Sequence, residues 1–223
     1  QTSDSQGEFV KITDVQNQYT NISDFKYIGL LGDTFIYYYS VVDKSDKVDE
    51  SSTEGNESAE GNDSEVILKK HYSIAAYNFK TKTYTEILRR NIDESESGKL
   101  KCNPMLISKN IQPEGSTSTA EYLVNVGYSF FKIKFSASDA QDFSPSEVEE
   151  WVIDSNMLNA IKGFFVDNLG STMGIEVAIS DIAPWATYAD MYSVAFTSYS
   201  ANGSSDFVPQ TILVKITLLK TVL

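Results

Sequence analysis

Apolar residues along the chain gather in short runs that are separated by turn residues. The clearest run covers residues 129–135, in which three apolar side chains alternate with Lys132 and Lys134. Successive side chains of a strand point to opposite faces of a sheet. The alternation therefore predicts a strand with one buried face and one polar face.

Comparable runs recur along most of the chain, and several are joined by short turn sequences. Gly32-Asp33, residues 80–82 and Gly127-Tyr128 each separate two runs and predict hairpins. The predicted strands cover residues 27–31, 35–42, 72–79, 84–88, 121–126, 129–135, 175–179, 192–199 and 211–219. This pattern predicts a mainly β fold of antiparallel hairpins or a meander, either partly propeller-like or sandwich-like.

One segment departs from the strand pattern. Ser144 is a suitable N-cap, Pro145 favours the first helical position, and Glu147 follows the cap by three residues. Apolar residues then recur at helical spacing as far as Phe165. We therefore predict one helix that starts near residue 145.

The distribution of charge divides the chain. Residues 43–65 hold nine acidic residues and two lysines, a local charge of -7 within a total of -13. Such a segment buries too little apolar surface to offset the entropy of ordering it. We predict a flexible polar segment at 1–20, a single mainly β domain at 21–223, and an acidic loop insertion at 43–65.

The composition argues against several functions. With 31 acidic residues, 18 basic residues and two arginines, the chain has no basic stripe for nucleic acid. No apolar run reaches the roughly 18–20 residues that span a bilayer, so we expect no transmembrane segment. Cys102 and His71 are the only residues of their types, which excludes an internal disulfide and a two-histidine metal site.

The opening residues are small and polar, as in a tether that follows a cleaved signal or a lipid-anchored cysteine. We therefore expect an extracytoplasmic protein, secreted or lipid-anchored at the cell surface. No cofactor is predicted, although oxygen ligands at 43–65 and at Asp167-Asn168 leave calcium open.

The candidate binding residues are aromatic. Trp185 and Tyr188 lie in a small-residue connection with nearby acids, a setting in which sugars and protein partners are often held. Tyr38 lies in a run of three tyrosines that presents rings to both faces of one strand. The alternative is that the loop aromatics fold back and close the end of the core.

Residues 73–83 (Ser-Ile-Ala-Ala-Tyr-Asn-Phe-Lys-Thr-Lys-Thr) resemble a β-propeller blade, in which a strand, a polar turn and another strand follow one another. Residues 128–138 are similar more loosely. The resemblance is to blade repeats of bacterial extracytoplasmic, lipoprotein-type proteins, and it implies that the acidic segment is a hairpin loop within one blade. Corresponding positions Ile74, Phe131 and Leu213 are 57 and 82 residues apart, whereas propeller repeats are roughly 40–50 residues long.

The sequence contains no recognisable catalytic motif. The predicted function is a non-enzymatic extracytoplasmic binding or scaffold module, whose partner is a protein or a glycan at the cell surface. The alternative is a carbohydrate-active hydrolase that uses a pair of carboxylates. A third hypothesis, a chain that assembles with another subunit or with missing propeller blades, predicts an exposed apolar sheet edge or patch.

Overall fold

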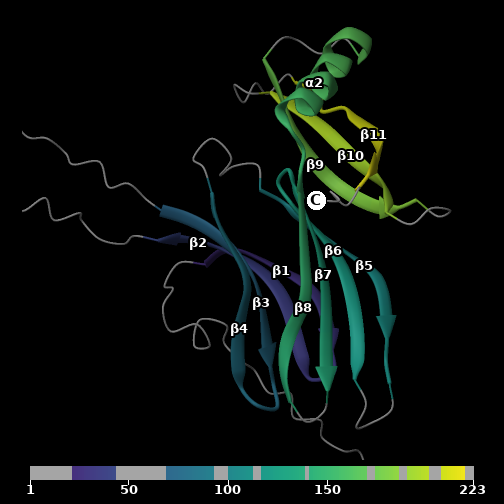
Figure 1. The fold of residues 1–223 in the computed structure, drawn as a ribbon. Coiled ribbons are helices and arrows are strands. Elements are labelled where there is room, and N and C mark those ends of the chain that lie inside the picture. The colour runs from purple at the N-terminus through teal and green to yellow at the C-terminus, as the bar shows by residue number, and fades with distance from the viewer. Residues whose placement is uncertain are drawn as a thin grey trace, which may run out of the picture.

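The computed structural model describes residues 22–43, 69–92, 100–112, 117–138, 141–169, 174–185, 190–200 and 207–218. In these residues, three antiparallel sheets and one helix confirm the predicted mainly β fold (Figure 1). The predicted segment 1–20, all of the acidic insertion except Asp43, and Tyr188 lie outside the described residues.

The first sheet is a meander of β1 (Ile22–Leu31), β2 (Thr34–Asp43), β3 (Lys69–Asn78) and β4 (Thr83–Ile92). The second sheet is a meander of β5 (Cys102–Asn110), β6 (Ser118–Val126), β7 (Ser129–Ser138) and β8 (Gln141–Val152). Helix α2 (Ser155–Leu169) follows it. The third sheet contains β9 (Ile175–Pro184), β10 (Met191–Ser200) and β11 (Thr211–Thr217) in the order β11-β10-β9.

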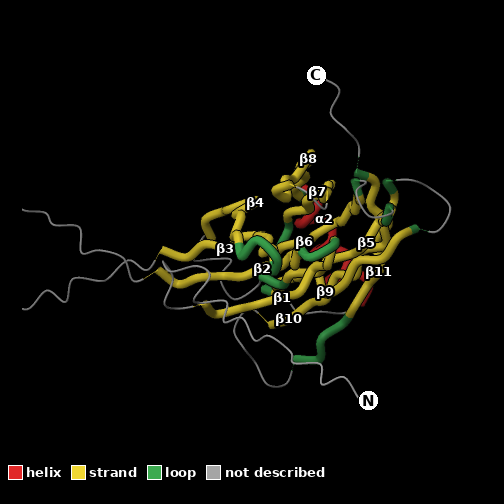
Figure 2. Tube along the Cα trace, turned by 90° about the horizontal axis from the view of Figure 1, so that it is seen from below, coloured by secondary structure: helices red, strands yellow, loops and turns green. Residues whose placement is uncertain are grey.

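The second sheet lies in the middle of the molecule and buries side chains on both faces. One face packs on the first sheet through a core that includes Ile74 and Phe131. The other face packs on α2 and the third sheet through residues such as Phe130 and Phe165. Figure 1 shows the first and second sheets together, with α2 and the third sheet beyond one end of them, and in the view from below in Figure 2 the third sheet overlaps the other two.

The strand predicted for residues 129–135, with one buried face and one polar face, is confirmed. Phe131, Ile133 and Phe135 are each 0% exposed and face the first sheet. Lys132 and Lys134 lie on the opposite face of β7, beside the cross-strand glutamates of β8. The predicted hairpin turns are also present, and Gly32 (φ 57°) and Gly127 (φ 58°) take the left-handed conformation that favours glycine.

The predicted start of the helix is wrong. Residue 145 lies in strand β8, and α2 begins ten residues later at Ser155. Glu147 and Glu149 of β8 pair with Lys134 and Lys132 of β7, so the pairing of opposite charges across the strands outweighs the local capping pattern. The N-cap of α2 is instead Asp154, whose Oδ1 accepts the backbone N–H of Met157 at 2.8 Å.

Strand β5 was not predicted from the sequence. It contains Pro104, which has no backbone N–H to donate to a ladder. The strand nevertheless forms because β5 is an edge strand of the second sheet and is hydrogen-bonded within that sheet to β6 alone. The other edge of β5 lies beside β9, where Asn103 Nδ2 donates to the carbonyl of Ile179 at 3.3 Å.

Candidate functional site

The structure separates the aromatic residues that the sequence suggested as a site. Tyr38 is 2% exposed and lies in the core between the first and second sheets, where burial raises its pKa. It is therefore a core residue and is not available as a surface platform. Trp185 is 41% exposed just after β9, and Tyr188 lies outside the described residues.

Trp185 contacts β11, one of the two edge strands of the third sheet. Its backbone N–H donates to the carbonyl of Met191 at 2.9 Å, which fixes the end of β9 against β10. Its ring centroid is 5.6 Å from Nζ of Lys215 on β11, within the range of a cation–π contact. Trp185 thus contacts a lysine that also lines the groove between α2 and β11.

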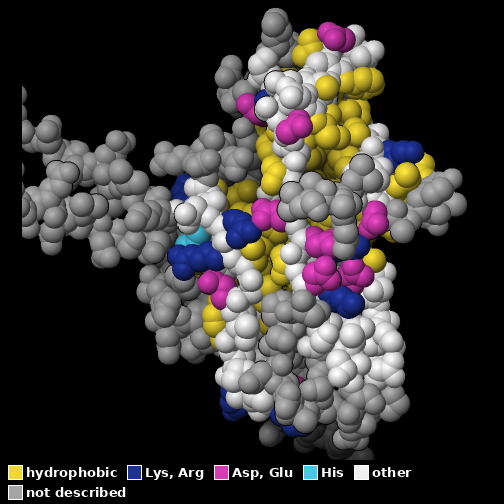
Figure 3. Space-filling model, viewed as in Figure 1, with side chains coloured by type: hydrophobic (Ala, Val, Ile, Leu, Met, Phe, Trp, Pro, Cys, Tyr) yellow, Lys and Arg dark blue, Asp and Glu magenta, His cyan; other side chains and the backbone are white. Residues whose placement is uncertain are grey.

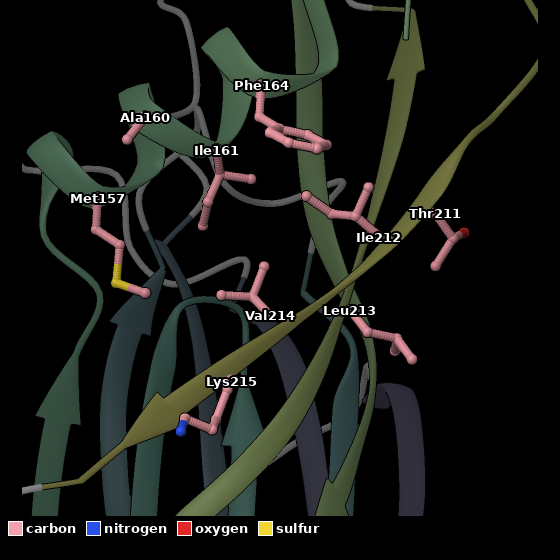
Figure 4. A pocket seen from close by; sticks show the side chains of 9 residues that line it. All are labelled: Met157, Ala160, Ile161, Phe164, Thr211, Ile212, Leu213, Val214 and Lys215. Atoms are coloured by element: carbon pink, nitrogen blue, oxygen red, sulfur yellow. The ribbon is translucent and has the colours of Figure 1, made fainter. Parts of the chain in front are cut away.

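The groove between α2 and β11 is apolar and has a volume of about 770 Å³. Figure 4 shows side chains of the helix and of the strand pointing toward each other across it. Figure 3 shows hydrophobic side chains gathered over the part of the molecule that contains α2 and the third sheet. The groove is lined by Met157, Ala160, Ile161, Phe164, Thr211, Ile212, Leu213, Val214 and Lys215.

The helix has more apolar surface than its packing uses. Ile161 and Phe165 are 6% and 0% exposed and face the core. Met157, Ala160 and Phe164 follow at spacings of three and four residues, which places them in a neighbouring stripe. Phe164 remains 45% exposed, so this second stripe forms an open wall of the groove.

Strand β11 forms the other wall and is an edge of the third sheet. Ile212 and Val214 point toward α2, whereas Leu213 points to the opposite side and is 74% exposed (Figure 4). The first and second sheets each have four strands, but the third has three in the described part of the chain. An exposed apolar sheet edge is the feature that the assembly hypothesis predicted.

The backbone groups that face the open edge follow from the pairing of β11 with β10. On either side of β11, Gln210 accepts the N–H of Ser198 and Leu218 donates to Asp190, both at 2.9 Å. The register between these two contacts has no shift, and alternate residues of an antiparallel strand face the same neighbour. Even-numbered residues therefore bond to β10. The N–H and C=O groups of Thr211, Leu213, Lys215 and Thr217 face outward.

Charged side chains form a separate cluster between the second sheet and Asp190, the residue before β10. Lys132 Nζ lies 3.0 Å from Asp190 Oδ1 and 3.3 Å from Glu121 Oε1. Burial lowers the pKa of Lys132, but the two carboxylates outweigh this effect and raise it. The adjoining cavity is about 90 Å³, well below the roughly 300 Å³ of a small ligand pocket. Glu121 and Asp190 are ion-paired with Lys132, and the cavity beside Glu121 and Lys132 is too small to enclose a sugar ring.

The described residues contain no group of three or more histidine, cysteine or acidic side chains that could hold a metal ion. Within the same part of the chain, no helix is both long enough and apolar enough to cross a membrane. The acidic segment that left calcium open in the sequence lies outside the described residues, apart from Asp43.

Cys102 packs against the core between the first and second sheets, and burial raises its pKa from 9.0 to about 12. This shift lowers the thiolate fraction at pH 8 by roughly a thousandfold relative to an exposed thiol. We therefore expect native protein to react with iodoacetamide far more slowly than protein in urea, as measured by mass spectrometry. Equal rates in the two states would contradict the packing of Cys102 against this core.

No family model matches this chain, and searches of curated proteins and of solved structures found no significant match. The groove is thus the feature from which a function can be argued. The sequence pattern predicted β11 as a strand. It did not indicate that Met157, Ala160 and Phe164 line a groove beside that strand. A second apolar stripe at helical spacing was the available signal, obscured by the early placement of the helix start.

Proposed function

We propose that this protein is a non-enzymatic binding or scaffold module that docks a polypeptide segment on the surface formed by α2 and β11. The observation that carries the proposal is an apolar groove beside a strand edge with which no described strand pairs. Unpaired backbone groups of an edge strand can accept an added strand, and an adjoining groove can hold the alternate side chains of that strand. The proposed setting remains extracytoplasmic, as expected from the sequence.

The dimensions of the surface define the chemistry of the segment. Strand β11 is seven residues long, so an added strand of similar length would satisfy its outward-facing backbone groups. Alternate side chains of the segment would lie beside Val214 and Phe164, which favours Val, Ile or Leu. On the opposite face, the aliphatic stem of Lys215 can pack on an apolar side chain of the segment, and its ammonium can pair with a carboxylate.

The arrangement of the three sheets supports a role in assembly. The corresponding positions Ile74, Phe131 and Leu213 lie on the third strands β3, β7 and β11. The first strands β1 and β5 lie side by side, as do β5 and β9. Both features suit the resemblance to propeller blades. A fourth strand beside β11 would complete the third meander.

The proposal is tested with a fluorescein-labelled heptapeptide that has Ile at alternate positions and Glu and Thr between them. Binding is followed by fluorescence anisotropy, at protein concentrations at which sedimentation shows a monomer. We expect saturable binding to the wild-type protein. We expect Ala160→Arg to weaken binding by roughly tenfold or more, because the guanidinium would occupy the groove.

The matched control is Ala183→Arg, which adds the same side chain at an exposed position of β9 outside the groove. This variant should bind the peptide as the wild-type protein does. Absence of binding to the wild type, or equal loss in both variants, would refute the docking surface.

A further inference from the structure

We propose that the segment docked on β11 is β11 of a second copy of this chain, which forms a symmetric dimer with a continuous sheet. This inference rests on the proposed function, because it names the partner of the same surface. A two-fold dimer requires a surface that is complementary to itself. The sequence of β11 has this property.

Strand β11 reads Thr-Ile-Leu-Val-Lys-Ile-Thr, and reversing it changes only the positions of Leu213 and Lys215. Antiparallel pairing of two copies about Val214 places Thr211 opposite Thr217 and Ile212 opposite Ile216. It also places Leu213 opposite Lys215 of the second copy, whose aliphatic stem can cover the leucine. Every residue of the strand then has a cross-strand neighbour of compatible chemistry.

The backbone geometry agrees with this register. Outward-facing groups belong to odd-numbered residues, as derived above from the contacts of Gln210 and Leu218. Pairing about Val214 joins residue 211 to 217 and residue 213 to 215, so that odd-numbered residues face odd-numbered residues. Hydrogen-bonded pairs therefore form without a bulge in either strand.

The charges that line the groove permit the same occupant. Lys215 is the single charged residue among those that line the groove, whereas the whole chain has a net charge of -13. Two copies can therefore meet on this surface without opposing carboxylates. In the dimer, the two lysines lie diagonally and do not face each other directly.

Symmetry also accounts for the apolar wall of the groove. A two-fold axis through the Val214 pair, perpendicular to the sheet, would place both α2 helices on the same face of the joined sheet. Phe164, which is 45% exposed in one copy, would then lie beside the seam between the copies. The dimer buries the apolar stripe of the helix together with the strand edge.

Sedimentation velocity over a concentration series tests the dimer, and two substitutions at one position isolate the backbone contribution. Leu213→Pro removes an outward-facing N–H without removing a bond to β10, whereas Leu213→Thr keeps that N–H and loses the same leucine side chain. We expect the wild type and Leu213→Thr to form dimers, and Leu213→Pro to raise the dimer dissociation constant by roughly tenfold or more relative to Leu213→Thr. Circular dichroism checks that both variants fold.

A disulfide test of the register does not depend on the proline variant. In a Cys102→Ser background, Val214→Cys should form a disulfide between copies on oxidation, because two Val214 residues face each other across the axis. Ile212→Cys should not, because its counterpart is Ile216.

A wild-type protein that stays monomeric at all concentrations would overturn the dimer, as would equal dimerisation of both Leu213 variants or equal crosslinking at 212 and 214. In that case, heptapeptide binding decides the proposed function separately. A monomer that binds the peptide keeps the docking surface and loses the second copy as its occupant.

Discussion

Replacing Gly29 with alanine is expected to destabilise the fold by ~2–4 kcal/mol. Gly29 lies on β1, where the first sheet meets Tyr122 of the second sheet. A Cβ at this position would lie 2.8 Å from Cε1 of Tyr122 and closer still to its hydroxyl. Tyr122 is 3% exposed and packs against Phe135 at a centroid distance of 5.8 Å, so its ring cannot move without disturbing the core.

Urea denaturation of Gly29→Ala measures this effect, and Gly163→Ala is the matched control. A Cβ at Gly163 meets nothing within 4 Å, and the residue lies inside helix α2. Alanine there should stabilise the protein by ~0.5–1 kcal/mol. If both substitutions changed the free energy of unfolding in the same direction, the close approach of β1 to Tyr122 would be wrong. Tyr122→Leu should recover part of the loss in the double variant.

Asn125→Leu is expected to cost ~2–4 kcal/mol, although leucine has a similar volume. Asn125 is 0% exposed, and its amide donates to the carbonyls of Gly127 and Ser129 at 2.8 and 3.0 Å. Its oxygen accepts the side-chain amide of Asn103 at 3.0 Å. Leucine removes all three hydrogen bonds and leaves their partners in a site that water does not reach.

Thermal unfolding compares this variant with Asn110→Leu, an exposed position near the end of β5 that should change stability by less than ~0.5 kcal/mol. Asn125→Asp should also be strongly destabilising at neutral pH, because a carboxylate cannot donate to the two carbonyls and would be buried as a charge. A wild-type melting temperature for either Asn125 variant would show that the hydrogen-bond network does not hold the β6–β7 hairpin.

The strands were predictable where local chemistry and tertiary packing agree. The alternation around Lys132 and Lys134 and the glycines at 32 and 127 specify strand faces and turns within a few residues. Those signals depend on neighbours in sequence alone. They located most strands of all three sheets, including β11.

The start of the helix and the site were not predictable in the same way. The pattern at 144–147 matches a helix N-cap. Cross-strand pairing of Glu147 and Glu149 with lysines on β7 instead stabilises a strand there. The groove arises where α2 crosses beside β11, which depends on packing between segments distant in sequence. Likewise, the alternation in the tyrosine run shows that Tyr38 faces away from its neighbours, but not which face is covered.

The order of the strands has a consequence for how the chain acquires its structure during synthesis. Every strand pair in the described sheets joins consecutive strands, so pairing can begin as each hairpin emerges from the ribosome. The first sheet can therefore close its hydrogen bonds before the second sheet exists. Until the second sheet arrives, Ile36, Tyr38 and Ile74 form a bare apolar face, and this nascent intermediate is the state most exposed to aggregation and to capture by chaperones.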